Sequence, residues 1–150
     1  QYVGDLDEGR TDPAAQPEVV GDGKGMASVD GHGTFGQVVA TFATQLAIKK
    51  AREYGISLVN MINLGHTGRV GAYPEMVAEE GMAAIMNTGF VGGKGNVAPF
   101  GGLKPKLGTN PIAMGFPYAS DGPILMDFAT STEAAAILAH HGFDPVLVGM

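Results

Sequence analysis

The chain has 150 residues, of which 45% are hydrophobic and 16% charged, and its formal net charge at pH 7 is -6. This balance is typical of a compact globular domain and excludes a disordered or fibrous chain. Because Lys and Arg form no cluster or stripe, we expect a small ligand as the main partner, with no nucleic acid and no membrane. The lack of cysteine, of a signal peptide and of an apolar stretch near ~20 residues favours a soluble, cytoplasmic protein.

The first half of the chain predicts an arm, a hairpin, a helix and a strand. Residues 1–18 are polar and contain prolines at 13 and 17, which predicts an extended connecting arm. The stretch VVGDGKGMASVD at 19–30 predicts a hairpin that ends in a strand at 26–30. Apolar residues then recur at helical spacing from Phe35 to Tyr54, Gly55 follows as a C-cap, and residues 56–62 have the length of a buried strand.

The second half predicts one helix, three strands and a long loop. A helix is expected over 71–81 and a strand over 82–89, followed by a glycine-rich loop at 90–111, and long loops of this kind are commonly functional or mobile. Two strands at 112–118 and 123–129 are joined by the turn sequence ASDG. This order predicts an α/β fold with a mixed sheet and flanking helices.

The sequence GHGTFG, which begins at Gly31, matches the G-x-G-x-x-G pattern between a predicted strand and a predicted helix, the context of a dinucleotide-binding turn. The acidic residue that such a site uses for the ribose is missing, since Asn60 and Asn63 stand at the next strand end. His32 and Phe35 would also add bulk near the phosphates. The alternative is a tight turn in which the glycines permit unusual φ angles and close packing.

The sequence NLGHTGRVGAYPE at 63–75 places polar groups between a predicted strand and a predicted helix. An imidazole (His66), a hydroxyl (Thr67) and a guanidinium (Arg69) stand there with Gly68 and Gly71. In open α/β sheets ligands bind at such strand ends, and free backbone N–H groups with a nearby arginine favour an anion. The alternative is a loop with a surface arginine and a capping histidine.

Two later segments offer further ligand contacts. Thr109 and Asn110 in GTNP are able to bind a carboxylate or amide, or else to form a capped turn. Asp127 ends an apolar strand and needs a partner, for which we consider ribose hydroxyls, while Thr130 or Ser131 as a helix N-cap is the alternative. The two histidines of the tail have no further ligand at metal spacing, so no metal site is predicted.

Three segments, NLGHTGRVGAY, VAPFGGLKPKLGTNPIAMGFP and LMDFATS, together resemble the malate/L-lactate dehydrogenase family, whose members include sulfolactate and ureidoglycolate dehydrogenases and piperideine-2-carboxylate reductases. The resemblance implies a non-Rossmann NAD(P)-binding domain at 19–134, after the arm at 1–18 and before a divergent or truncated tail at 135–150. It implies NAD or NADP as cofactor and hydride transfer with a 2-keto or 2-hydroxy acid such as malate or lactate, or with a cyclic imino acid. A homodimer is implied by the resemblance alone.

Carried over by position, the resemblance implies cofactor contacts from eight residues: His66, Thr67, Gly68, Arg69, Val70, Asp127, Phe128 and Ala129. It implies a substrate contact from Thr109. The family's Ser-His-Gly motif and arginine, which supply the proton donor and the carboxylate clamp, would stand before residue 1, so the catalytic residues remain unknown and we expect a fragment. A non-catalytic remnant or binding domain is the alternative. In this family the turn at GHGTFG leads into a packing helix, which favours the tight-turn interpretation.

Overall fold

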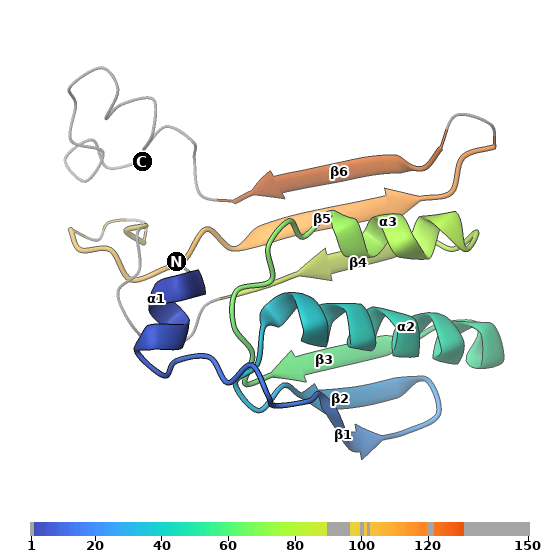
Figure 1. The fold of residues 1–150 in the computed structure, drawn as a ribbon. Coiled ribbons are helices and arrows are strands. Elements are labelled where there is room, and N and C mark those ends of the chain that lie inside the picture. Colours follow the sequence, from blue (N-terminus) through green and yellow to red (C-terminus); the bar gives the residue numbers. More distant parts are fainter. Residues whose placement is uncertain (1, 90–96, 100, 102, 120–121, 131–150) are drawn as a thin grey trace.

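The structure, a computed structural model, describes residues 2–89, 97–99, 101, 103–119 and 122–130. The described residues form three helices and six strands in two sheets (Figure 1). In chain order these are α1 (Tyr2–Asp7), β1 (Glu18–Asp22), β2 (Met26–Asp30), α2 (Gly36–Tyr54), β3 (Leu58–Ile62), α3 (Ala72–Glu79), β4 (Ala84–Asn87), β5 (Pro111–Phe116) and β6 (Ile124–Ala129). The tail expected at 135–150 lies outside the described residues, as do residues 90–96, 100 and 102 of the predicted loop.

The two sheets have different topologies. In the order β1-β2-β3, β1 pairs antiparallel with β2 and β2 pairs parallel with β3, so this is the mixed sheet of the prediction. The order β4-β5-β6 is antiparallel throughout. Helix α2 packs on the first sheet and α3 on the second, both on the side nearer the viewer in Figure 1. The predicted α/β fold is therefore confirmed, with the strands divided between two small sheets.

Helix α2 forms the core of the first half with β2. Val29 on the strand and Val39 on the helix are both 0% exposed, and Ala43 joins them in one apolar cluster. The helix ends as its sequence predicts: Gly55 adopts φ = 83°, and its N–H donates to the Ala51 carbonyl at 2.8 Å. A left-handed residue at this position is what ends many helices, and glycine adopts it without steric cost.

Helix α3 packs closely on β5 because a glycine lies beneath it. A Cβ atom at Gly115 would lie 2.4 Å from the carbonyl oxygen of Pro74, in the first turn of the helix. The adjacent Ala113 is 0% exposed. The small side chains of β5 thus set the height of α3, and with it the place where its N-terminus meets the ends of the strands.

The arm is not extended throughout, which corrects the prediction for its first residues. Tyr2–Asp7 forms a helix, with the Asp5 carboxylate 2.7 Å from the Arg10 guanidinium beyond its end. The ring of Tyr2 lies edge-on to Phe35, with 6.3 Å between their centroids. So short a helix is not stable alone, and these contacts explain why it forms. Residues 12–17, which include both prolines, have neither helix nor strand, as predicted.

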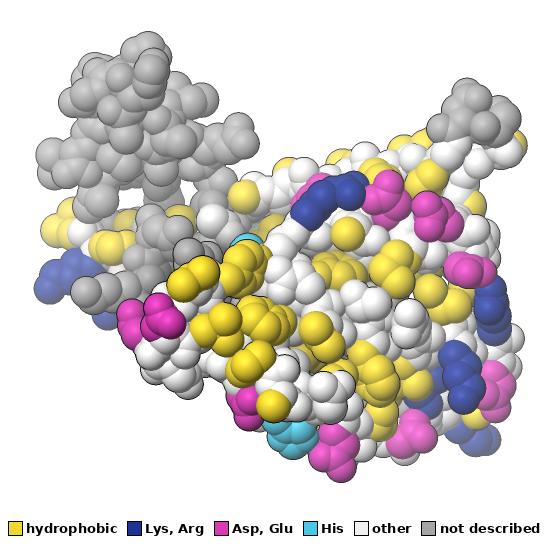
Figure 2. Space-filling model, in the orientation of Figure 1, with side chains coloured by type: hydrophobic (Ala, Val, Ile, Leu, Met, Phe, Trp, Pro, Cys, Tyr) yellow, Lys and Arg dark blue, Asp and Glu magenta, His cyan; other side chains and the backbone are white. Residues whose placement is uncertain are grey.

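The second sheet leaves its face opposite α3 uncovered by the described residues. The strand register places seven apolar side chains on that face: Ile85, Ile112, Met114, Phe116, Ile124, Met126 and Phe128. Ile85, for example, is 70% exposed. The helix side, seen in Figure 2, carries acidic and basic side chains interspersed around the helices.

Of the helices in the described ranges, none has the length and apolarity needed to cross a bilayer.

Candidate functional site

A cleft of about 1860 Å³ lies where three strands end and one begins. β3, β4 and β6 point their carboxyl ends to the same side of the molecule in Figure 1, and β5 starts there. The cleft is lined by residues 58–61, 64–70, 87–89, 108–112 and 127–130. Ligands of open α/β sheets collect at this edge, so the position agrees with the argument made from the sequence.

All nine residues that the sequence singled out for ligand contacts line this cleft. They come from three separate segments, HTGRV at 66–70, Thr109, and DFA at 127–129. The structure therefore brings together residues that are 63 positions apart at the extremes, between 66 and 129. Their roles toward a cofactor or substrate remain predictions.

The loop at 63–70 is fixed by buried groups while two of its polar side chains stay accessible. The Tyr73 hydroxyl donates to the Thr67 carbonyl oxygen at 2.5 Å, and burial raises the pKa of Tyr73, which keeps this donor protonated. Thr67 is 6% exposed and Val70 is buried. His66 and Arg69 are exposed. The loop thus has a rigid backbone with an imidazole and a guanidinium available to a ligand.

The guanidinium of Arg69 lies at the start of α3. Its Nη1 atom is 2.8 Å from Oε2 of Glu75, and the Arg69 side chain is 58% exposed. An exposed ion pair of this kind contributes little to stability. An incoming anion is therefore able to share or replace Glu75 at a small energetic cost.

Asp127 is also held at the start of α3. The N–H of Gly71 donates to Asp127 Oδ2 at 2.7 Å. A Cβ atom at Gly71 would lie 2.7 Å from that oxygen, so glycine is required for the contact. A carboxylate at a helix N-terminus is favourable. Asp127 thus accepts a hydrogen bond from the backbone N–H at the start of α3. The Thr130 hydroxyl makes a separate contact: it donates to the Asn110 carbonyl at 2.9 Å and links the end of β6 to GTNP.

The GHGTFG turn serves packing and lies outside the residues that line the cleft. The Gly31 N–H donates to the Ile62 carbonyl at 2.9 Å and the Gly33 N–H to the Asn63 carbonyl at 2.7 Å, so neither is free for a phosphate. A Cβ atom at Gly36 would lie 2.1 Å from the Gly65 carbonyl oxygen. The glycines let α2 approach the loop at 63–66, which supports the tight-turn interpretation.

Sequence reasoning missed several residues of the site. Asn87 and Thr88 line the cleft at the carboxyl end of β4, where the strand-end rule applied to 82–89 would have found them. Tyr2 approaches the cleft from α1, and its hydroxyl oxygen is 2.8 Å from His66 Nδ1. Gln37 Nε2 donates to the same hydroxyl at 2.6 Å. Nothing in the local sequence indicates these last two contacts.

In the described part of the chain, no three His, Asp or Glu side chains gather as metal ligands would.

Comparison with known proteins shows that the chain is similar to part of several oxidoreductases. Residues 1–141 match the family model described as malate/L-lactate dehydrogenase. Malate dehydrogenase from Pyrococcus horikoshii is 41% identical over 131 residues, which are 87% of this chain and 35% of that protein. The structure of a putative malate/lactate dehydrogenase from E. coli superposes with a TM-score of 0.85 and 34% identity, over 95% of this chain and 40% of that one.

A third relative has a different name. The structure of Δ1-piperideine-2-carboxylate reductase from Pseudomonas syringae pvar. tomato superposes with a TM-score of 0.82 and 33% identity, over 95% of this chain and 43% of that one. The chain thus spans less than half the length of each of these relatives.

Proposed function

The chain belongs to the malate/L-lactate dehydrogenase family, and on that premise we propose that it forms the cofactor-binding part of an NAD(P)-dependent oxidoreductase. NAD or NADP binds in the cleft at the ends of β3, β4 and β6. The substrate is a 2-keto or 2-hydroxy acid, such as malate or lactate, or a cyclic imino acid. The relatives' names support this range of substrates, since one is a malate dehydrogenase and another reduces an imino acid.

The observation that carries the proposal is the convergence of HTGRV, Thr109 and DFA on one cleft. Its volume of about 1860 Å³ exceeds the roughly 300–1,000 Å³ of a typical small-molecule pocket. Such a space suits a ligand as long as a dinucleotide with an acid beside it. The tight turn at GHGTFG, by contrast, has its N–H groups at 31 and 33 engaged, which argues against the Rossmann manner of binding.

The residues present fit a nicotinamide dinucleotide chemically. Arg69, which is exposed and pairs with the half-buried Glu75, neutralises a phosphate. Asp127 holds the start of α3 with one oxygen, and its other oxygen accepts from a ribose hydroxyl. Phe128 offers an apolar surface to a flat ring, and the Thr109 hydroxyl donates to the substrate carboxylate. The nicotinamide, when bound, supplies or accepts a hydride at C4.

The direct test is titration of the purified chain with NADH and NADPH while nicotinamide fluorescence is followed. We expect saturable binding of one of them, without turnover on pyruvate, oxaloacetate or piperideine-2-carboxylate, because the chain spans less than half of each relative. A lack of binding of either nucleotide at millimolar concentration would overturn the proposal. A non-catalytic remnant that has lost the cofactor would give that result.

A matched pair of arginines tests where the nucleotide binds. Arg69 and Arg52 are equally exposed, 58% and 59%, and each pairs with a glutamate of α3 or its end, Glu75 and Glu80. Only Arg69 lines the cleft. Arg69→Met is expected to weaken binding about tenfold or more, as loss of a charge-assisted contact does, whereas Arg52→Met leaves the affinity unchanged. Equal effects from the two variants would remove the role of Arg69.

A homodimer and a cytoplasmic location stay predictions.

A further inference from the structure

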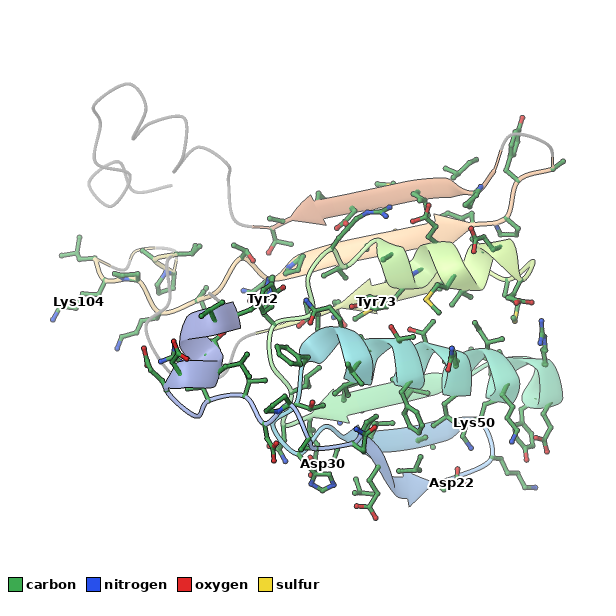
Figure 3. The ribbon with its side chains drawn as sticks, in the orientation of Figure 1. Tyr2, Asp22, Asp30, Lys50, Tyr73 and Lys104 are labelled. Atoms are coloured by element: carbon green, nitrogen blue, oxygen red, sulfur yellow. The ribbon has the colours of Figure 1, made fainter. Side chains whose placement is uncertain are left out.

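Three elements meet at the His66 imidazole. Tyr2 on α1 places its hydroxyl oxygen 2.8 Å from Nδ1 of the ring, and the ring centroids are 5.8 Å apart. Gln37, in the first turn of α2, approaches the same hydroxyl with its amide Nε2 at 2.6 Å. Figure 3 shows Tyr2 at the point where α1 comes close to the ends of the strands. The three side chains thus form a continuous chain, Gln37 to Tyr2 to His66.

The chemistry of these groups fixes the direction of that chain. An amide NH₂ group only donates hydrogen bonds, so the Tyr2 oxygen accepts from Gln37. Tyr2 keeps its own hydroxyl proton, and His66 Nδ1, at 2.8 Å, is the acceptor that the described residues offer to it. A neutral imidazole with an unprotonated Nδ1 carries its proton on Nε2. The second nitrogen of the ring is therefore the donor that a ligand meets.

We propose that Tyr2 is a positioning residue, which together with Gln37 holds neutral His66 in its Nε2–H tautomer, so that the cleft presents a hydrogen-bond donor to an anionic oxygen, a phosphate or a carboxylate. The identity of the ligand rests on the proposed function, whereas the tautomer does not. His66 lines the cleft beside Arg69, so a donor at Nε2 adds to the attraction of the guanidinium. With the opposite tautomer, a lone pair would face the same oxygen and repel it.

The packing of Tyr2 supports a positioning role. Its ring lies edge-on to Phe35, with 63° between the ring planes, and this contact comes from the residue directly before α2. The hydroxyl is thus aimed at the loop by a second, apolar contact that is independent of the hydrogen bonds. Preorganised partners of this kind hold a functional histidine in one tautomer and orientation.

The test reads the tautomer directly. Two-bond ¹H–¹⁵N NMR spectra of the full chain distinguish Nδ1–H from Nε2–H imidazole, at about pH 9 where ordinary histidines are neutral. The His66 signals are assigned by their loss in His66→Gln. We expect Nε2–H in the wild type, a mixture in Tyr2→Phe, and Nδ1–H in Gln37→Glu, because a carboxylate accepts from Tyr2 and reverses the chain. Nδ1–H in the wild type, or an unchanged tautomer in Gln37→Glu, would overturn the proposal.

Internal controls keep these outcomes distinct from misfolding. His32, whose Nε2 lies 3.0 Å from the Glu18 carboxylate at the start of β1, must keep its signals in every variant. Tyr54→Phe removes an exposed tyrosine hydroxyl at the far end of α2 and is expected to leave His66 unchanged. If Gln37→Glu fails to fold, the wild-type spectrum and Tyr2→Phe still decide the question.

The role toward the ligand is tested separately with NADH. In Gln37→Glu and Tyr2→Phe the Kd is expected to rise about two- to tenfold, the effect of one hydrogen bond. A reversed tautomer with an unchanged Kd would overturn the ligand part of the proposal and leave the proposed function intact. A wild type that does not bind NADH would contradict the proposed function, while the spectra still decide the tautomer.

Discussion

Replacing Gly36 with alanine tests how closely α2 approaches the loop that carries His66. A Cβ atom there would lie 2.1 Å from the Gly65 carbonyl oxygen, and ordinary contact begins at 3.4 Å, so the two segments must separate by 1.3 Å, the difference between these distances. The neighbouring atoms belong to the backbone and are unable to rotate away. Overpacking of this kind costs about 1–3 kcal/mol, against which alanine gains about 1 kcal/mol in helix propensity.

We therefore expect Gly36→Ala to lower the free energy of unfolding by about 0–2 kcal/mol, measured by urea unfolding followed by far-UV circular dichroism. NADH binding should weaken as well, because the shift moves His66. Gly4→Ala is the matched control, since a Cβ at this helical glycine meets no atom within 4 Å. We expect it to be at least as stable as the wild type. If Gly36→Ala exceeded the wild type in stability, helix propensity alone would govern the site and the close approach would be refuted.

Three further predictions concern groups that tie elements together. Lys50, whose side chain is 9% exposed, contacts a carboxylate and two carbonyl oxygens of the β1–β2 hairpin (Figure 3). Lys50→Met should therefore lower the free energy of unfolding by about 1–3 kcal/mol. The control, Lys49→Met on the exposed side of the helix, should change it by less than about 0.5 kcal/mol. Hydrogen bonds from a backbone N–H and from the Asn63 amide lower the pKa of Asp30 below its ordinary 3.8, so its contribution to stability is present above pH 3.8 and is lost as the pH falls below it. Asp30→Asn should therefore reduce the change in the free energy of unfolding between pH 5 and pH 3, measured by urea unfolding. An unchanged pH dependence would contradict this cause. Asp127→Asn removes a negative charge at the start of α3 and should cost about 0.5–1 kcal/mol, with a larger loss of NADH affinity; a gain in thermal stability would argue against the helix-start role.

Local sequence patterns were sufficient for the long and regular elements. The periodicity from Phe35 to Tyr54 and the following Gly55 predicted α2 and its C-cap, because helical spacing over five turns leaves few alternatives. The strands were predicted in the right order. Their ends agree at 26–30 and differ by up to two residues elsewhere, as the comparison of 56–62 with Leu58–Ile62 shows. Boundaries depend on hydrogen bonds to neighbouring strands, and the local sequence does not encode these.

Two features of the fold depend on contacts between distant residues, and the sequence did not predict them. Helix α1 has six residues, and its contacts with Phe35 and His66 involve residues more than 30 positions away. The division into two sheets follows from β3 and β4 not being paired, although each has the composition of a buried strand. Helix α2 packs on β2 and β3, and α3 packs on β4, β5 and β6, and the local sequence does not encode these contacts.

The candidate site was easier to predict than its support. Polar residues at strand ends are visible in a sequence, because an apolar run stops where they begin, and HTGRV, GTNP and DFA all follow or precede such runs. The residues that orient them lie on other elements: Tyr73 holds the Thr67 carbonyl, Gly71 meets Asp127, and Tyr2 meets His66. Each of these pairs crosses between segments, so pattern alone does not pair them.

The glycines of GHGTFG show why a motif has to be judged by what its backbone contacts. In a dinucleotide-binding turn the glycines admit a phosphate, whereas here the Cβ that each of two glycines lacks would meet the loop at 63–66. Both cases require a second group to approach the backbone closely. The same glycine pattern therefore occurs here, although the approaching group is a protein loop and not a phosphate. Because that neighbour is the loop bearing His66 and Arg69, the turn acts on the cleft indirectly: it brings the N-terminus of α2, and with it Gln37, within reach of Tyr2.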